Sequence, residues 1–340
     1  MSHSVLVTGA TGFIAKHCIA ELIRQGHTVR GTARKPEAHA HLARALDRAG
    51  VDASKLELRT ADLMADAGWD AALDGCSHVL HVASPFPVSV PRDRDEVVRP
   101  AREGTLRVLE AATRAGVQRV VLTSSMAACV HPSSGPQART YTEADWTDPQ
   151  RRDLGPYVVS KTLAERAAWD FVRSTPNAPE LAVINPGFVQ GPALDGDLST
   201  SHEVICFMAR GKYPAAPRAG FEVVDVRDVA SAHVVAMTHP AAAGERFLAT
   251  SGFLMLREMA QIVAHALPDT ASRVPRREIP DFVVRALALF DRNLLALLPD
   301  LSTRRTCDSS KARERLGLTF RPAREAVAAS AKSLRELGVI

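Results

Sequence analysis

A tyrosine and a lysine four residues apart, Tyr157 and Lys161, are the side chains best suited to proton transfer in this sequence of 340 residues. The spacing places both on one face of a helix. A free phenol has a pKa of about 10, too high for proton exchange at neutral pH, but a nearby ammonium group favours the phenolate and lowers that pKa. The pair therefore indicates acid–base chemistry, with Tyr157 giving its proton to an alkoxide.

Two hydroxyl groups, those of Ser124 and Ser125, follow the apolar run 120–123. The carboxyl ends of parallel strands border the ligand crevice of a sheet. A hydroxyl there can hydrogen-bond a substrate carbonyl and stabilise the negative charge that develops on its oxygen. Either serine could instead cap a helix, so the residues alone leave the choice between them open.

The segment TGATGFIA at 8–15 lies where a first strand meets a first helix. Its two glycines permit a tight turn and the close approach of a pyrophosphate to the helix N-terminus, and the small Ala15 allows the helix to pack on the strand. This position predicts a dinucleotide site. The residues of the turn expected to contact the nucleotide are Gly9, Thr11, Gly12, Phe13 and Ile14.

The end of the second strand distinguishes the two nicotinamide coenzymes. Sites for NAD place Asp or Glu there, on the ribose 2′-hydroxyl. This sequence reads GTARK at 31–35, with no acid. The guanidinium of Arg34 matches a 2′-phosphate, and cations at a helix start would otherwise oppose the helix dipole. Arg34 and Lys35 therefore predict NADPH or NADP+ as the cofactor.

The ends of the third and fourth strands complete the predicted crevice. Asp62 and Leu63 follow the third strand, where an adenine ring would lie. Ala83, Ser84 and Pro85 follow the fourth strand, on the nicotinamide side.

Short apolar runs alternate with amphipathic stretches through the first 186 residues. This alternation predicts an α/β fold with a parallel, doubly wound sheet, and strands that are almost wholly apolar are typical of a sheet covered on both faces. The predicted strands are 5–7, 28–32, 56–59, 78–82, 120–123 and 181–184. The predicted helices are 14–25, 37–49, 69–73, 96–115 and 155–173.

The alternation breaks in two places. Residues 131–156 contain four prolines and are predicted to form a long loop over one edge of the sheet. After Pro186 the pattern is irregular, with loops around 191–201 and 212–220. Since a single core rarely grows beyond about 250–300 residues, two lobes are expected. We expect a Rossmann NADP-binding domain at 1–186, rejoined by 222–249, and a smaller, discontinuous substrate-binding lobe at 187–340.

Composition excludes several classes of function. Net charge is small (42 − 38 = +4) and no basic block stands out, so nucleic acid is not an expected partner. The five cysteines show no metal-ligand spacing, so free thiols and no metal site are expected. Charged residues interrupt the apolar stretch 282–299, which argues against a membrane span. No basic region precedes the first strand, so we expect no secretion signal and a cytoplasmic protein.

Further motifs extend over nearly the whole chain. They are HVASPF at 81–86, VLTSS at 121–125, WTD at 146–148, YVVSKTLAERAAW at 157–169, INPGFVQGP at 184–192, VDVRDVASAH at 224–233 and SSKARERLG at 309–317. With the glycine turn and ARK at 33–35, the sequence resembles the extended short-chain dehydrogenases. The resemblance is to the branch of dihydroflavonol reductase, cinnamoyl-CoA reductase and the yeast methylglyoxal or ketone reductases.

This resemblance implies an NADPH-dependent carbonyl reductase that turns an aldehyde or ketone into an alcohol. It implies Ser125, Tyr157 and Lys161 as the catalytic triad, because the family's catalytic serine is the last of its run. It also places Arg34 at the 2′-phosphate.

The resemblance also implies contacts around the nicotinamide. Lys161 would hold the nicotinamide ribose, and the segment from Pro186 through Gly187 to Val189 would border the carboxamide. Thr123 and Tyr157 are expected beside the coenzyme as well.

Two other functions compete with reduction. One is sugar-nucleotide epimerase or dehydratase chemistry, or hydroxysteroid-type oxidation; epimerases keep NAD tightly bound, which Arg34 disfavours. The other is a nucleotide sensor without turnover, which could dispense with the triad.

The substrate is less defined than the reaction. Phe86, Met126, Phe188 and Phe207 are candidates for an apolar pocket that would take small or aromatic aldehydes and ketones. The substrate motifs of the plant enzymes are not evident. A monomer or a homodimer is expected.

Overall fold

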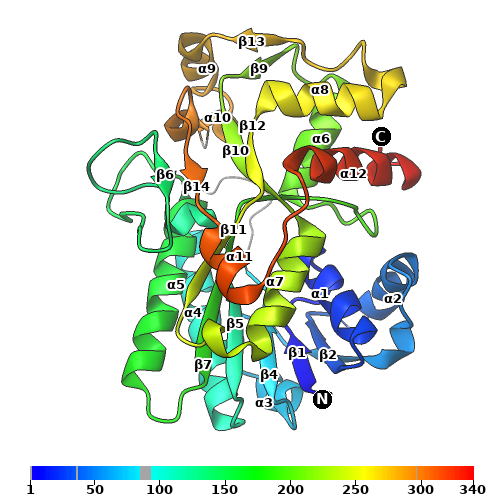
Figure 1. Ribbon diagram of the computed structural model, residues 1–340, viewed down its shortest axis with the longest axis vertical. Coiled ribbons are helices and arrows are strands. Elements are labelled where there is room, and N and C mark those ends of the chain that lie inside the picture. Colours follow the sequence, from blue (N-terminus) through cyan, green and yellow to red (C-terminus); the bar gives the residue numbers. More distant parts are fainter. Residues whose placement is uncertain (1, 36, 85–92, 296) are drawn as a thin grey trace.

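Seven strands form one parallel sheet in the computed structural model, which describes residues 2–35, 37–84, 93–295 and 297–340 (Figure 1). Their order across the sheet is β3-β2-β1-β4-β5-β7-β11, with every pairing parallel. The strands are β1 (Ser4–Val7), β2 (Thr28–Ala33), β3 (Leu56–Thr60), β4 (His78–His81), β5 (Arg119–Thr123), β7 (Glu180–Pro186) and β11 (Arg246–Ala249). This confirms the predicted doubly wound sheet. The chain order reverses between β1 and β4, the place where such sheets bind ligands.

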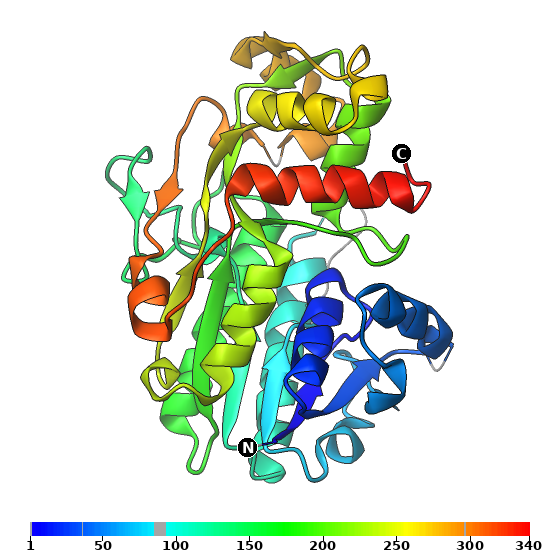
Figure 2. The same cartoon turned by 45° about the vertical axis from the view of Figure 1, so that its right-hand side comes forward.

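Helices cover both faces of the sheet (Figures 1 and 2). Val5 and Val7 belong to the apolar core on one face, while Leu6 between them belongs to the core on the other face, as the alternation along a strand requires. The helices of the first face are α1 (Phe13–Arg24), α2 (Ala38–Arg48) and α7 (Val226–Thr238). Those of the second face are α3 (Trp69–Leu73), α4 (Asp95–Arg114) and α5 (Pro156–Ser174).

The predicted helices and strands agree with these elements to within two residues at each end. The agreement follows from composition, since all residues of β4 and β5 are buried and the helices begin and end at clear signals. Pro156 occupies the first turn of α5, and glycines with positive φ follow α1 and α4.

A second apolar core lies above the carboxyl ends of the large sheet. Its centre is a three-stranded sheet of β8 (Phe188–Gln190), β10 (Gly220–Asp225) and β12 (Gly252–Met255). The helices around it are α6 (Thr200–Arg210), α8 (Leu256–Ala266), α9 (Asp281–Leu287), α10 (Arg292–Leu295) and α12 (Ala323–Glu336). Figure 2 shows α12 (red) crossing the molecule between α8 and the large sheet.

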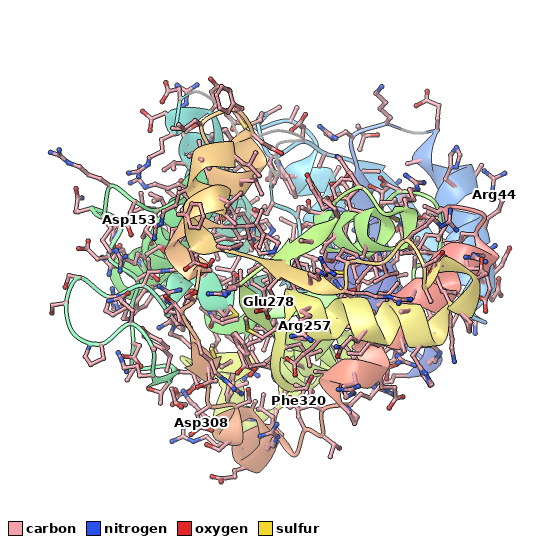
Figure 3. The ribbon with its side chains drawn as sticks, turned by 90° about the horizontal axis from the view of Figure 1, so that it is seen from above. Arg44, Asp153, Arg257, Glu278, Asp308 and Phe320 are labelled. Atoms are coloured by element: carbon pink, nitrogen blue, oxygen red, sulfur yellow. The ribbon has the colours of Figure 1, made fainter. Side chains whose placement is uncertain are left out.

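Figure 3 shows this upper side of the molecule. Helix α8, which carries Arg257, lies beside the strand β13 (Arg277–Ile279), which carries Glu278 and pairs with β9 (Ala215–Pro217). Arg44 of α2 and Asp153 lie at opposite edges of this view.

The stretch 131–156 differs from the predicted loop. It contains the short strand β6 (Thr140–Tyr141), which pairs in parallel with β14 (Thr306–Cys307) from the far end of the chain. Tyr141 is completely buried there. Periodicity cannot reveal a two-residue strand whose partner is so distant in the sequence.

Residues beyond Pro186 return to the large sheet. Helix α7 packs against α1, and β11 extends the sheet beside β7. Helix α11 (Ser310–Leu316) also reaches this face, where Ala312 and Leu316 join its core. Among the described residues, no helix combines the length and the apolar character needed to span a bilayer.

Candidate active site

Ser125 and Tyr157 meet at the carboxyl end of β5. Ser125 follows that strand and accepts a hydrogen bond from the backbone N–H of Ala127, 3.2 Å away, at the start of a short 3₁₀ turn. Tyr157 lies in the first turn of α5, and its phenol is hydrogen-bonded by the Ser125 side chain. The two hydroxyl groups thus lie side by side, as a pair of donors to one carbonyl oxygen requires.

The pKa of Tyr157 differs from the expectation drawn from the sequence. Lys161 is expected to lower it, but burial raises the pKa above its usual value, and the hydrogen bond from Ser125 offsets only part of that effect. The free-energy cost of removing the phenolate from water exceeds the stabilisation that the Ser125 hydrogen bond gives it. Tyr157 therefore carries its proton at neutral pH, as a proton donor must.

Lys161 lies one turn further along α5 and is 8% exposed. Its Nζ donates to the backbone carbonyl of Thr123, 3.2 Å away. Burial lowers the pKa of Lys161 to about 8, against the charge of Glu165, which raises it. At neutral pH most molecules therefore carry the Lys161 ammonium, and a rise of about one pH unit would deprotonate half of them.

Ser124 makes a different contact from Ser125. Its hydroxyl donates to Glu165 Oε2 at 2.5 Å, on the inner side of α5. The structure therefore separates the two serines, with Ser125 beside Tyr157 and Ser124 in a buried polar network.

The glycine turn joins β1 to α1. Gly9 has a φ of +66°, and a Cβ there would lie 2.9 Å from the Cβ of Ala83, at the end of β4. Gly12 precedes α1 without a side-chain cap, and the first turn of α1 contains no acidic residue. Thr11, Phe13 and Ile14 are partly exposed beside it. The start of α1 offers the backbone N–H groups of its first turn to an anion.

Arg34 and Lys35 follow β2 and are both exposed. In the described part of the chain neither side chain has an ion-pair or hydrogen-bond partner, so both remain available to a ligand phosphate. The end of β2 lies beside the glycine turn, because Ala10 N–H donates to the carbonyl of Thr32 at 2.8 Å.

The ends of β3 and β4 lie on either side of this turn. Asp62 accepts the N–H of Met64 at 2.9 Å, and Leu63 packs against Gly104 of α4. Ala83 N–H donates to Thr8 Oγ1 at 3.0 Å, which fixes the end of β4 against β1. Ser84 lines the same small cavity as Lys161. Pro85 and Phe86 lie outside the described residues.

The segment after β7 approaches the second sheet closely. A Cβ on Gly187 would lie 2.3 Å from the carbonyl oxygen of Glu222 in β10, so only glycine fits. Pro186 ends β7 beside Ala249, and Val189 pairs with Val224. Thr123 is buried, with its hydroxyl 2.6 Å from His233 Nε2.

The aromatic and methionine candidates for the substrate pocket do not form one cluster among the described residues. Phe188 stacks on Phe221, with 5.0 Å between ring centroids, within the upper core. Phe207 contacts the Tyr213 ring edge to face. Met126 packs on a separate small core around Tyr141.

Three polar residues at this site were not predicted from the sequence. Glu165 is fully buried and forms an ion pair with Arg246 at 2.6 Å, and Asn185 donates to Glu165 at 2.8 Å. One signal could have revealed Glu165, since 157, 161 and 165 share a helix face. Arg246 and Asn185 come from other strands and gave no such signal.

The sequence of this chain matches a protein family and several named reductases. Residues 5–249 match the model of the NAD dependent epimerase/dehydratase family. The chain is 36% identical to cinnamoyl-CoA reductase CAD2 of Medicago truncatula over 255 residues, 73% of this chain and 76% of the relative. It is 32% identical to ketoreductase azaE of Aspergillus niger over 352 residues, 99% of this chain and 98% of the relative.

A solved structure shares the whole fold. Yeast methylglyoxal/isovaleraldehyde reductase Gre2, complexed with NADPH, superposes with a TM-score of 0.81 and 26% identity. The match covers 99% of this chain and 100% of that one.

Proposed function

The chain belongs to the NAD dependent epimerase/dehydratase family, and within it we propose that this protein is an NADPH-dependent carbonyl reductase that converts an aldehyde or ketone into an alcohol. The observation that carries the proposal is the pairing of Ser125 with Tyr157 beside Lys161, at the carboxyl edge of the sheet. The reductases named among its relatives support the same reaction class.

The residues present fit a bound NADPH. Gly9 lets the turn lie close against the end of β4, the start of α1 is free of acidic side chains, and Arg34 is exposed, with no carboxylate partner among the described residues. Arg34 would hold the 2′-phosphate through two N–H groups, with Lys35 adding charge. When bound, the coenzyme supplies the hydride that adds to the carbonyl carbon.

Each residue of the triad then has a distinct task. The Ser125 hydroxyl donates a hydrogen bond to the carbonyl oxygen and stabilises negative charge as it develops there. Tyr157, kept protonated by burial, transfers its proton to the same oxygen. The Lys161 ammonium then stabilises the phenolate that remains.

The proposed substrates are small or aromatic aldehydes and ketones. A buried serine–tyrosine pair recognises the carbonyl oxygen alone, so the reaction class follows without the identity of the attached groups. Met126 directly follows Ser125 in the sequence and is the described apolar candidate nearest to it along the chain.

The test is a screen of NADPH consumption with aldehydes, prochiral ketones and β-keto esters, followed by identification of the alcohol. We expect NADPH oxidation that depends on the carbonyl compound, and much weaker activity with NADH. Retention of tightly bound NAD with no net reduction of any carbonyl would instead indicate epimerase-type chemistry.

A further inference from the structure

The side chain of Glu165 lies behind the candidate triad, on the same face of α5 as Tyr157 and Lys161. It is fully buried, and each carboxylate oxygen accepts hydrogen bonds. Oε2 accepts from Ser124 Oγ at 2.5 Å and from Asn185 Nδ2 at 2.8 Å. Oε1 accepts from Arg246 Nε at 2.6 Å. A buried carboxylate with this many donors is fixed in position.

Two sets of hydrogen bonds connect Glu165 to Ser124 and Ser125, which we call the serine turn. The first is the direct hydrogen bond from Ser124. The second passes through Asn185, whose Nδ2 also donates to the backbone carbonyl of Ser125 at 3.1 Å. The carboxylate thereby restrains the side chain of one serine and the backbone of the next, which sets where the Ser125 hydroxyl points.

Glu165 also faces Lys161. The two residues are one helical turn apart and line the same cavity of about 10 Å3, together with Ser84, Thr105 and Ser124. Among the described residues, Glu165 is the one charged group that acts on the Lys161 ammonium. His81 of β4 also lies near, but burial and the Lys161 charge lower its pKa to about 3, so it is neutral. Tyr157 is neutral as well, because burial raises its pKa.

Arg246 holds the carboxylate from β11. Its Nη1 donates to the backbone carbonyls of Glu143 and Asp145, at 2.8 and 3.0 Å, and its Nη2 donates to Glu165 Oε2 at 3.3 Å and to Cys129 Sγ at 3.2 Å. Its guanidinium lies 3.7 Å from the centroid of the Trp146 ring. Arg246 therefore holds Glu165 against the 131–156 stretch. Against the effect of burial, the charge of Glu165 helps to raise the pKa of Arg246, so the guanidinium stays charged.

We propose that Glu165 is a positioning residue for the reaction, whose carboxylate, anchored on Arg246, holds the serine turn and serves as the counter-charge of the Lys161 ammonium. The inference rests on the proposed reductase function. A purely structural ion pair would explain the contact between α5 and β11, but it would predict no effect on the titration of Lys161.

The test compares Glu165→Gln with Glu180→Gln. Glu180 pairs with Arg119 at 2.7 Å across β5 and β7, at the opposite end of the same sheet, and is an exposed control for the loss of a Glu–Arg ion pair away from the site. Gln keeps the size of Glu and a hydrogen-bond acceptor but removes the charge. The alkaline limit of kcat is the apparent pKa at which kcat falls as the pH rises. In Glu165→Gln it should move down by about one pH unit, so that kcat measured at about pH 8 is about fivefold lower than in wild type. Glu180→Gln should leave that limit in place.

A second readout needs neither coenzyme nor turnover. The sequence has seven lysines, so NMR of protein labelled on the lysine side chains can follow each one with pH, and the signal missing from Lys161→Met identifies Lys161. Glu165→Gln should lower the pKa of Lys161 by about one unit relative to wild type.

A charge left unpaired on Arg246 could prevent Glu165→Gln from folding. The double variant Glu165→Gln with Arg246→Met removes both charges and should show the same two shifts. Variants that retain the wild-type alkaline limit and the wild-type Lys161 titration overturn the inference. A wild-type protein that reduces no carbonyl compound overturns the proposed function instead, and the NMR titration still decides the role of Glu165.

Discussion

The Tyr157 hydroxyl is positioned to give up a proton, because it is hydrogen-bonded by Ser125 and kept protonated by burial. We expect Tyr157→Phe to lower turnover roughly 100- to 10,000-fold, the usual contribution of general acid catalysis. NADPH binding should change little, since the ring is retained. Fluorescence titration and steady-state rates measure the two effects, and a variant that keeps more than about a tenth of wild-type turnover would refute the assignment.

The two serines should differ in the kind of damage their loss causes. Ser125→Ala removes a donor to the carbonyl oxygen and should cost about 2.7–4 kcal/mol in transition-state stabilisation. Ser124→Ala leaves buried Glu165 short of one hydrogen bond, so we expect lower stability, by about 1–3 kcal/mol, and a smaller loss of turnover. Rates and thermal unfolding of both variants check this. Equal losses of turnover would speak against a special role for Ser125.

Arg34 should determine the coenzyme preference. A charge-assisted hydrogen bond contributes about 1.5–3 kcal/mol, so one contact with the 2′-phosphate gives roughly a 10- to 150-fold preference for NADPH. Arg34→Ala should raise the KM for NADPH and leave NADH kinetics almost unchanged. Lys35→Ala should do less, since an ammonium lacks the guanidinium fork. An Arg34 variant that weakens both coenzymes alike would contradict this role.

At the scale of elements, the turn between β1 and α1 must keep its backbone close to β4. Gly9→Ala would strain a left-handed residue, at about 1–2 kcal/mol, and also force a Cβ against Ala83, which lies 2.9 Å from its position. We expect lower stability and weaker NADPH binding. Chemical denaturation and fluorescence titration measure both.

Gly26→Ala is the matched control for Gly9→Ala. Gly26 ends the same helix with a φ of +80°, and no atom lies within 4 Å of its Cβ position. Gly26→Ala should lose about as much stability from backbone strain as Gly9→Ala does, but it should bind NADPH normally. Normal NADPH affinity in Gly9→Ala would show that the turn does not approach the coenzyme.

At the scale of the whole molecule, buried histidines should make the fold sensitive to acid. Burial lowers the pKa of His17, His202 and His233 to about 4 and that of His81 to about 3. Below about pH 6.5 the unfolded chain binds protons that the folded protein excludes, so stability is complete above that pH and is lost as the pH falls toward about 4. Each of these histidines lowers the free energy of unfolding by up to about 1.4 kcal/mol for each pH unit of acidification in this range.

Calorimetry should therefore show the Tm falling between about pH 6.5 and about pH 5. His41→Gln, which changes an exposed histidine, should leave that slope unchanged. A Tm that stays constant over this range would mean that the four histidines are not neutral and buried in solution.

The sequence by itself determined the sheet and its covering helices, and its residues indicated acid–base chemistry beside a dinucleotide site. Those features depend on local information: apolar runs of strand length, glycines and prolines at element ends, and two side chains spaced by one helical turn at 157 and 161. The rule that carboxyl ends of parallel strands share an edge placed the serine pair near Tyr157 and Lys161, and the choice of Ser125 over Ser124 came from the family resemblance. Their catalytic roles, and the division into two lobes, remain predictions.

Only the tertiary structure decided which polar groups surround that triad. Glu165, Asn185 and Arg246 come from one helix and two strands, and their contact depends on how α5 packs against the sheet that contains β7 and β11. The raised pKa of Tyr157 likewise follows from burial, which spacing cannot report. The pairing of β6 with β14 joins segments that no local pattern relates. Contacts between segments far apart in the sequence form when hydrophobic cores close around them, so they become visible only in the folded chain.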